Sequence, residues 1–186
     1  MEVVDNDESV VNAAESAHGL KLTRRGSSGQ VGISVVLADA AAHVSSLPAD
    51  SVNCILLDAY DAKGRVPTHL QAAPFLKDLG RCLAPGGTII ANLWNGTEAA
   101  RKEAESFRKT LVGAAQGVAC YGLRVVGHEK NRILIATKPA ADEAAQPRLA
   151  SQRRRLELAA DAHAASGTEP AMLETMRSNA ATLEAW

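Results

Sequence analysis

Asp58 and Asp61 are the residues whose type and spacing best suit chemistry in this chain. They follow the apolar segment Val52 to Leu57, which has the length and composition of a buried strand. In an open parallel sheet, ligands bind beyond the carboxyl ends of the strands, so an acid at that position faces the ligand. A carboxylate there can hold a polar substrate group and receive its proton. Asp58 is therefore the first candidate for a catalytic residue, and Asp61 is the second.

The residues after these acids predict the elements that position them. Gly64 and Pro67 mark a loop, residues 70–83 have the composition of a helix, and residues 88–93 form a second apolar segment. Gly86-Gly87 is interpreted as a turn that leads from the helix into that segment. A strand, a helix and a strand in this order predict two parallel strands.

The same alternation extends along the rest of the chain. Apolar residues make up 46% of the sequence and aromatic residues only 3%, which suits parallel strands covered by Ala-rich helices. The expected elements are strands at residues 3–5 and 33–39, helices at 9–17, 40–46 and 98–113, and an antiparallel strand pair at 120–126 and 132–137. The sequence thus predicts an α/β fold with a mostly parallel sheet and an antiparallel pair near its end.

The composition changes after Pro139. Beyond it, Ala, Glu, Gln and Arg dominate, with helices expected near residues 149–165 and 169–183. We expect one domain over residues 1–138 and an Ala-rich helical tail over residues 139–186.

The central phrase of the sequence resembles a known family. In the spermidine synthase-like (polyamine aminopropyltransferase) group of class I S-adenosylmethionine-dependent methyltransferases, a strand ends in Asp-x-x-Asp, as in Asp58-Ala59-Tyr60-Asp61. A Gly- and Pro-containing loop and a helix then lead to Leu-x-Pro-x-Gly, as in Leu83-Ala84-Pro85-Gly86-Gly87, and to a strand that ends here at Asn92-Leu93-Trp94. The resemblance covers roughly residues 1–138 and implies a Rossmann-like methyltransferase sheet.

The resemblance also implies donor-binding residues. Asp5 matches the acid that accepts hydrogen bonds from the ribose hydroxyls of the donor. Asp39, followed by Ala40, matches the position that meets the adenine amino group. The implied donor is S-adenosylmethionine or its decarboxylated form. The alternative is that Asp5, Asn6 and Asp7 form a helix cap and that Asp39 caps the helix at Ala40, because Asp and Asn are strongly preferred at caps.

On the acceptor side, the resemblance implies an amine that attacks the carbon next to the donor sulfonium. Asp58 and Asp61 would act in catalysis, and Tyr60 would line the acceptor pocket. The acids could instead belong to a turn and a loop, and Tyr60 could pack on its own strand. The acceptor would be a small-molecule or protein amine. Polyamine-forming members usually have small hydroxyl residues where Ala59 and Tyr60 stand, so methyl and aminopropyl transfer both remain open.

Family members normally open with a strand and a Gly-x-Gly loop that contact the donor, and no residue precedes Met1 here. Gly26-Ser27-Ser28-Gly29 follows a helix and does not replace that loop. We therefore expect an N-terminally truncated sheet in which residues 3–5 pair with residues 52–58 or lie loosely. We also expect weak donor binding. Two alternatives are a catalytically silent domain, acting as a homodimer or as a partner subunit, and an inactive fragment of a longer enzyme.

Other features exclude whole classes of function. The net charge of −1 offers no basic surface for nucleic acid, and no apolar stretch approaches the roughly 20 residues that span a membrane. The acidic N-terminus does not resemble a secretory or transit peptide. Cys54, Cys82 and Cys120 are far apart in apolar segments, so we expect buried thiols in the cytoplasm. The histidines lack metal-ligand spacing, and we expect no metal site.

Overall fold

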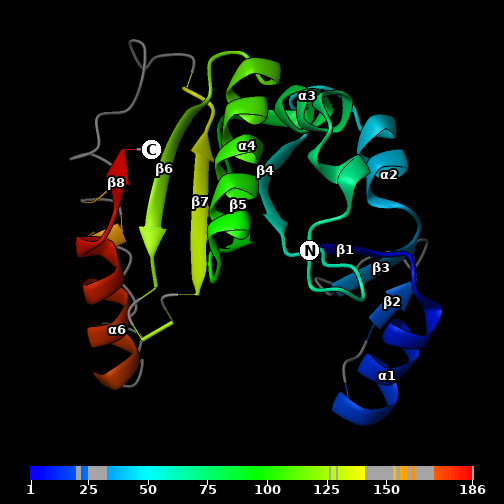
Figure 1. The fold of residues 1–186 in the computed structure, drawn as a ribbon. Helices are drawn as coiled ribbons and strands as arrows, with labels where there is room; N and C mark the ends of the chain where they lie inside the picture. The colour runs from blue at the N-terminus through cyan, green and yellow to red at the C-terminus, as the bar shows by residue number, and fades with distance from the viewer. Residues whose placement is uncertain are drawn as a thin grey trace. The chain divides into compact units, whose positions relative to one another are not determined.

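The computed structural model describes residues 1–19, 22–24, 33–125, 127–128, 130–140, 153, 156–158, 161 and 170–185 of the 186-residue chain. The chain forms two compact units, residues 1–47 (unit 1) and residues 48–186 (unit 2). Each unit is described by itself, and Figure 1 labels the elements of both.

Unit 1 is a small parallel sheet with two helices. Its elements, in chain order, are β1 (Glu2–Asp5), α1 (Glu8–His18), β2 (Leu22–Arg24), β3 (Ile33–Leu37) and α2 (Ala40–Ser46). The strands lie in the order β1-β3-β2, and both pairings are parallel. β1, α1, β3 and α2 confirm the strands and helices that the sequence predicts in this region. The strand β2 was not predicted.

Aspartates begin both helices of unit 1. Asp7 is the N-cap of α1, because its side chain accepts a hydrogen bond from the Ser9 backbone N–H. Asp39 caps α2 in the same way through the Ala42 backbone N–H. Gly19 ends α1 with a left-handed φ of 64°, a conformation that glycine adopts at little cost. These local signals set the helix boundaries.

Unit 2 contains a five-stranded mixed sheet. The strands lie in the order β4-β5-β7-β6-β8, in which β4 and β5 are parallel and the other neighbours are antiparallel. Their bounds are Val52–Leu57 for β4, Leu83–Trp94 for β5, Ala119–Arg124 for β6, Asn131–Thr137 for β7 and Glu184–Ala185 for β8. The antiparallel pair of β6 and β7 confirms the expectation from the sequence. Residues 3–5 were expected to pair with residues 52–58 or to lie loosely, and this expectation is wrong, because β1 pairs with β3 in unit 1 and β4 pairs with β5 in unit 2.

The helices of unit 2 are α3 (Ala73–Cys82), α4 (Glu98–Ala114) and α6 (Pro170–Ala181), and a 3₁₀ turn, η1, covers Thr68–Gln71. The single helix expected at residues 70–83 is therefore divided into η1 and α3. Pro74 lies in the first turn of α3, where its missing N–H and fixed φ are tolerated, and this explains the helix start at Ala73.

Gly86 and Gly87 lie in an irregularity of β5 instead of in a separate turn before the strand. The register against β4 runs from Val52 opposite Leu83 to Cys54 opposite Thr88, so β5 bulges between these pairs. Gly86 has a φ of 77°, and a Cβ added at Gly87 would lie 2.7 Å from the Ala84 carbonyl oxygen. Both positions therefore require glycine.

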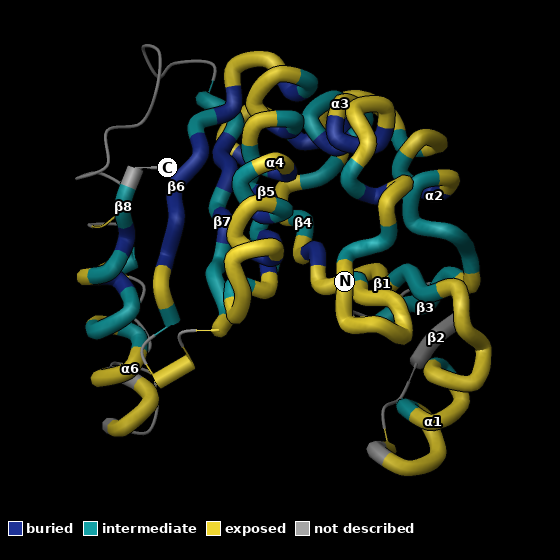
Figure 2. Tube along the Cα trace, in the orientation of Figure 1, coloured by how far each residue is buried: buried dark blue, intermediate teal, exposed yellow. Residues whose placement is uncertain are grey.

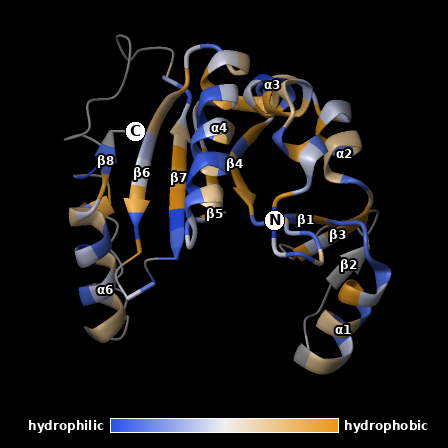
Figure 3. Cartoon of the chain, viewed as in Figure 1, coloured by the Kyte–Doolittle hydropathy of each residue, from blue (hydrophilic) through white to orange (hydrophobic). Residues whose placement is uncertain are grey.

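The core of unit 2 lies between one face of the sheet and the helices α3 and α4. On β5, Ile89, Ala91 and Leu93 alternate with less buried residues and are nearly inaccessible to solvent. Ala100, Ala104, Phe107 and Leu111 form the buried stripe of α4 at helical spacing. Figure 2 shows a long buried stretch in β6, and Figure 3 shows β7 changing from hydrophilic at its start to hydrophobic further along.

Cys82 and Cys120 are buried, but Cys54 is exposed on β4. The expectation of a buried thiol is wrong for Cys54, because β4 is paired only with β5 and lies at the edge of its sheet. The helix expected at 149–165 lies mostly outside the described residues. Within the described part of the chain, no helix has both the length and the apolar character that crossing a bilayer requires.

Candidate active site

Asp58 and Asn92 meet at the carboxyl ends of the parallel strands β4 and β5. Leu57 of β4 lies opposite Ala91 of β5. Asp58 and Asn92 are the residues that come next after this pair. The Nδ2 of Asn92 donates a hydrogen bond of 3.0 Å to Oδ1 of Asp58. Asp58 is exposed, so the amide holds one carboxylate oxygen while the group stays open to a ligand.

Asn92 is the centre of this cluster, although from the sequence it was expected only as part of a strand end. Its Oδ1 accepts a hydrogen bond of 3.1 Å from Asn131 Nδ2, and its backbone carbonyl accepts one of 2.7 Å from the Tyr60 hydroxyl. Because Asn131 donates to the amide oxygen, the amide NH₂ group faces Asp58. Asn92 therefore orients Asp58 and Tyr60 together.

Tyr60 is a hydrogen-bond donor in this arrangement. Partial burial raises the pKa of the Tyr60 phenol, and the negative charge of Asp58 raises it further. The phenol therefore remains protonated at neutral pH, in agreement with its bond to the Asn92 carbonyl. A tyrosine held in this way can line a pocket and cannot serve as a base.

Asp61 shapes the loop that follows β4. Its Oδ1 accepts hydrogen bonds from the backbone N–H groups of Lys63 at 2.8 Å and Arg65 at 3.0 Å. The Arg65 N–H is the main cause of the lowered pKa of Asp61, and the Lys63 N–H and the charges of both basic residues act in the same direction. Gly64 has a φ of 70° within this loop. The contacts match the alternative expected from the sequence, in which Asp61 belongs to a loop.

The far end of the loop is fixed by Gln71. Its Nε2 donates hydrogen bonds of 2.7 Å both to the Val66 carbonyl and to Glu103 Oε1 on α4. Asp61 at one end and Gln71 at the other therefore hold the loop in a defined position beside the ends of β4 and β5.

Two adjoining cavities lie beside this loop. The larger has a volume of about 310 Å³ and is lined by Tyr60, Lys63, Gly64, Asn92, Trp94 and Asn131. The smaller, of about 20 Å³, shares Tyr60, Gly64 and Trp94 and also contacts Phe107. The chain has two residues each of Phe, Tyr and Trp, and one of each kind lines these cavities. The larger volume is near the lower limit of small-molecule sites, about 300 Å³.

In unit 1, Asp5 and Asp39 lie at the same edge of the sheet. Asp5 is the last residue of β1, Asp39 follows the adjacent parallel strand β3, and the Ala38 N–H donates to the Asp5 carbonyl over 2.9 Å. Asp5 Oδ1 accepts a hydrogen bond of 2.8 Å from the Asp7 backbone N–H, whereas Asp39 is a helix cap and Ala40 begins α2. The cap role expected as an alternative thus applies to Asp39, and within the cap expected at Asp5, Asn6 and Asp7 the N-cap residue of α1 is Asp7.

The structure therefore groups the expected residues into two sets, Asp5, Asp39 and Ala40 in unit 1 and Asp58, Tyr60 and Asp61 in unit 2. Asn92, Trp94 and Asn131 join the second set. Among the described residues, no group of three or more His, Cys, Asp and Glu side chains is arranged to hold a metal ion.

No protein-family model matches the sequence, and a comparison with curated proteins gives no match either. Similarity to known proteins appears when their three-dimensional structures are compared with this one. Human methyltransferase-like protein 13 in complex with SAH aligns over 100% of this chain and 72% of its own, with a TM-score of 0.61 and 19% identity.

Spermidine synthases align as well. One in complex with the transition-state analogue AdoDATO aligns over 95% of this chain and 60% of its own, with a TM-score of 0.58 and 12% identity. A probable spermidine synthase from Corynebacterium glutamicum aligns over 74% of this chain and 46% of its own, with a TM-score of 0.53 and 17% identity. The chain therefore spans about half the length of these spermidine synthases.

Identities this low demonstrate the fold alone. The chain shares the Rossmann-like α/β fold of these methyltransferase and spermidine synthase structures, with parallel and antiparallel strands and helices. The α/β prediction is confirmed at this level. Spermidine synthases and a methyltransferase match to a similar degree, so the matches do not distinguish the subgroup.

Proposed function

We propose that this chain is a transferase that moves an aminopropyl or methyl group from an adenosyl sulfonium donor to an amine. The observation that carries the proposal is the cluster of Asp58, Asn92 and Tyr60 at the ends of β4 and β5, beside an aromatic-lined cavity. Structures of the same fold bound to SAH and to AdoDATO support an adenosyl ligand.

The acceptor amine binds beside Asp58 in this proposal. An ammonium ion is attracted by the exposed carboxylate, and the faces of Tyr60 and Trp94 in the cavity wall favour a cation further. The amine loses its proton before reaction. Its nitrogen lone pair then attacks the carbon next to sulfur, a C–N bond forms, and the C–S bond breaks. The bonding pair moves to sulfur, which leaves as a neutral thioether and needs no acid.

Asp58 orients the amine in this mechanism and does not permanently take its proton. An amine with an ordinary pKa near 10.4 and a carboxyl group near 3.9 differ by about 6 units, so complete transfer costs roughly 9 kcal/mol. Asp58 is exposed, and water can carry the proton away. The carboxylate then stabilises the ammonium that develops as the C–N bond forms. Asp61, whose Oδ1 is engaged by the loop, keeps the loop in place, and a direct catalytic role for it stays a prediction.

The donor is S-adenosylmethionine or decarboxylated S-adenosylmethionine. Asp5 accepts hydrogen bonds from the ribose hydroxyls through the carboxylate oxygen that does not face the Asp7 N–H. Asp39 and Ala40, at the start of α2, meet the adenine. We assign this activity to the domain predicted at residues 1–138 and place the protein in the cytoplasm, with a diamine or a lysine-bearing protein as acceptor.

Calorimetric titration of the full chain tests the donor assignment. S-Adenosylmethionine, its decarboxylated form and methylthioadenosine are titrated separately, and we expect at least one to bind. Asp5→Ala should weaken that binding about tenfold, because charge-assisted hydrogen bonds are worth about 1.5–3 kcal/mol. Asn6→Ala, an exposed neighbour without an assigned role, is the matched control and should bind normally.

Mass spectrometry of diamine and lysine-peptide acceptors after incubation with each donor then tests the transfer. A mass increase for one methyl or one aminopropyl group would identify the reaction. If no donor binds to the folded chain, the catalytically silent partner subunit becomes the better description.

A further inference from the structure

The charges around the larger cavity are unevenly placed. Its lining residues are Tyr60, Lys63, Gly64, Asn92, Trp94 and Asn131. Lys63 is the charged residue of this set, and the others are aromatic, amide or glycine residues. The negative charge of Asp58 lies next to this lining, because Asn92 Nδ2 donates to Asp58 Oδ1 over 3.0 Å. A molecule in the cavity therefore meets a carboxylate at one border and an ammonium in the wall.

The loop that carries Lys63 is closed by hydrogen bonds. The Lys63 N–H donates to Asp61 Oδ1 over 2.8 Å, and the Gly64 N–H donates to the Asp61 carbonyl over 2.9 Å. The Asp61 N–H in turn donates to the Arg65 carbonyl over 2.8 Å. The backbone of Lys63 is thus fixed in the cavity wall before a ligand binds, which lowers the entropy cost of binding.

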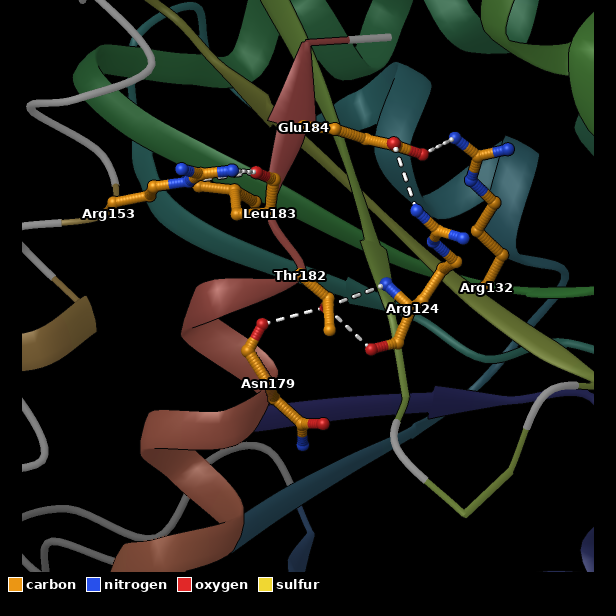
Figure 4. A network of polar contacts seen from close by, with 7 residues as sticks. All are labelled: Arg124, Arg132, Arg153, Asn179, Thr182, Leu183 and Glu184. Carbon is orange, nitrogen blue, oxygen red and sulfur yellow. Dashed lines mark hydrogen bonds and ion pairs between the residues drawn. The ribbon is translucent and has the colours of Figure 1, made fainter.

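The charge of Lys63 differs from that of basic residues elsewhere in unit 2. Figure 4 shows Arg132 directed toward Glu184, whose carboxylate lies 2.6 Å away and neutralises it. Among the described residues, no carboxylate forms an ion pair or a hydrogen bond with the Lys63 ammonium. The Arg65 N–H is the main cause of the lowered pKa of Asp61, and the charge of Lys63 is the smallest cause, so Asp61 acts on this ammonium only weakly. The positive charge in the wall is therefore open to an anionic group of a ligand.

Asn131 provides a second hydrogen-bond donor in the same wall. One N–H of its amide donates to Asn92 Oδ1 over 3.1 Å. An amide NH₂ group has two N–H donors, and within the described part of the chain the second one has no partner. A carboxylate can accept hydrogen bonds from an ammonium and from an amide at the same time. Lys63 and Asn131 are thus suited to a carboxylate.

We propose that the acceptor is a small amine that also carries a carboxylate, such as a diamino acid, and that Lys63 and Asn131 bind this carboxylate while Asp58 holds the reacting ammonium. The inference rests on the proposed transfer to an amine and narrows the class of its acceptor. The carboxylate of the acceptor takes no part in the bond changes. Lys63 is then the residue that distinguishes diamino acids from plain diamines.

The size and the walls of the cavity agree with such an acceptor. Its volume of about 310 Å³ is near the lower limit of small-molecule sites, which favours a free amino acid. Tyr60 and Trp94 supply apolar ring surface for the aliphatic chain between the amine and the carboxylate.

Calorimetric titration of the full chain with L-lysine and with L-lysinamide tests the anionic site. Both ligands carry two amines, and only lysine has a free carboxylate. At low ionic strength we expect lysine to bind about tenfold more tightly than lysinamide, because its carboxylate adds charge-assisted hydrogen bonds.

Lys63→Met keeps an unbranched side chain and removes its charge. It should reduce the preference for lysine to about twofold, which is what the Asn131 amide retains. Lys77→Met is the matched control, because Lys77 is exposed on α3 and lines neither cavity. In this control the preference should stay about tenfold.

Equal affinity of the wild type for the two ligands, or no binding of either to the folded chain, would overturn the anionic site. A preference that Lys63→Met leaves unchanged would overturn it as well. The comparison of the two ligands on the wild type needs no variant, so the inference stays testable even where a substitution prevents folding.

Asp58→Asn separates this inference from the proposed function. It should weaken the binding of lysine and lysinamide by the same factor and leave the preference between them unchanged. If Asp58→Asn affects neither ligand while Lys63→Met removes the preference, the carboxylate site is supported and the amine site of the proposed transferase is wrong. If Asp58→Asn weakens both ligands but the wild type shows no preference for lysine, the amine site stands and the anionic site is wrong.

Discussion

Unit 1 and unit 2 are stabilised in different ways. All the apolar side chains that are buried among the described residues belong to unit 2, where Leu76 and Leu79 are 0% exposed. The buried side chain of unit 1 is His43, which hydrogen-bonds Glu2 at 2.8 Å. Leu37 of β3 remains 53% exposed. Figure 2 shows the same contrast between the mostly exposed α1 and the mostly buried β6 of unit 2.

This difference concerns the proposed donor residues of unit 1 and the proposed acceptor residues of unit 2, taken separately. In unit 1, helix caps and short strand ladders hold the elements, and a cap contributes about 1 kcal/mol. In unit 2, each fully buried leucine contributes about 1.5–3 kcal/mol. The proposed donor residues thus lie in a unit that depends on local interactions, whereas the proposed acceptor residues rest on a packed core. We expect donor binding to order its unit more than acceptor binding does.

The largest expected effect separates the roles of the two units. Asp58→Asn keeps the shape of the side chain but removes the charge that steadies the amine, so transfer should fall about 10³-fold, or about 4 kcal/mol, with donor affinity nearly intact. Asp5→Ala should have the opposite effect, because it should weaken donor binding more than it lowers the rate of transfer. Steady-state kinetics together with calorimetry measure both effects. Equal loss of donor affinity in the two variants would show that these roles are misassigned.

The next effect tests the contrast in burial directly. Leu76→Ala, at a site that is 0% exposed, should lower the free energy of unfolding by about 3 kcal/mol because it leaves a cavity. Leu37→Ala makes the same chemical change in unit 1 and should cost less than about 1 kcal/mol. Urea denaturation followed by circular dichroism measures both values. A loss at Leu37 as large as that at Leu76 would mean that unit 1 has an apolar core after all.

A smaller effect concerns the rigidity of the acceptor side. Asn92→Ala removes the amide that holds Asp58, while the carbonyl that binds Tyr60 stays. One such hydrogen bond is worth about 0.5–1.5 kcal/mol, so kcat should fall about tenfold with donor affinity unchanged. Asn131→Ala, which touches Asn92 but not Asp58, should lower kcat about threefold. An unchanged kcat in both variants would leave Asn92 with a purely structural role.

The sequence predicts what local patterns determine. The strand ends at Asp5 and Leu57 and the start of α2 after Asp39 follow from apolar segments and from a capping residue. The loop role of Asp61 was among the alternatives expected from the sequence, because Asp followed by Lys63 and Gly64 is typical of a turn.

The parts that the sequence did not predict depend on contacts between distant segments. Asn92 and Asn131 meet only because β5 and β7 are antiparallel neighbours, and no spacing in the sequence indicates that pairing. In the same way, Glu184 finds Arg132 only once β8 has joined β6. The contacts of such residues can be identified only from the folded structure.

The smallest expected effect concerns the ion pair of Glu105 and Arg108 on α4, which is partly exposed to solvent, in contrast to the buried apolar residues of unit 2. Hydrogen bonding to Arg108 lowers the pKa of Glu105 from 4.5 to about 2. Because the folded-state pKa is the lower one, this pair stabilises the protein above pH 4.5, and the contribution disappears as the pH falls through about 2. The Glu105 side chain is 37% exposed, so solvent partly screens the pair, and Glu105→Gln should cost less than about 1 kcal/mol at pH 7.

Urea denaturation of the wild type and of Glu105→Gln between pH 7 and pH 2 measures this contribution. The difference in unfolding free energy should be constant above about pH 5 and should vanish near pH 2. Glu98→Gln is the matched control on the same helix, because Glu98 also pairs with an arginine three residues later but is more exposed. Its effect should be smaller than that of Glu105→Gln. A difference that persists unchanged at pH 2 would assign the contribution of Glu105 to packing and not to its charge.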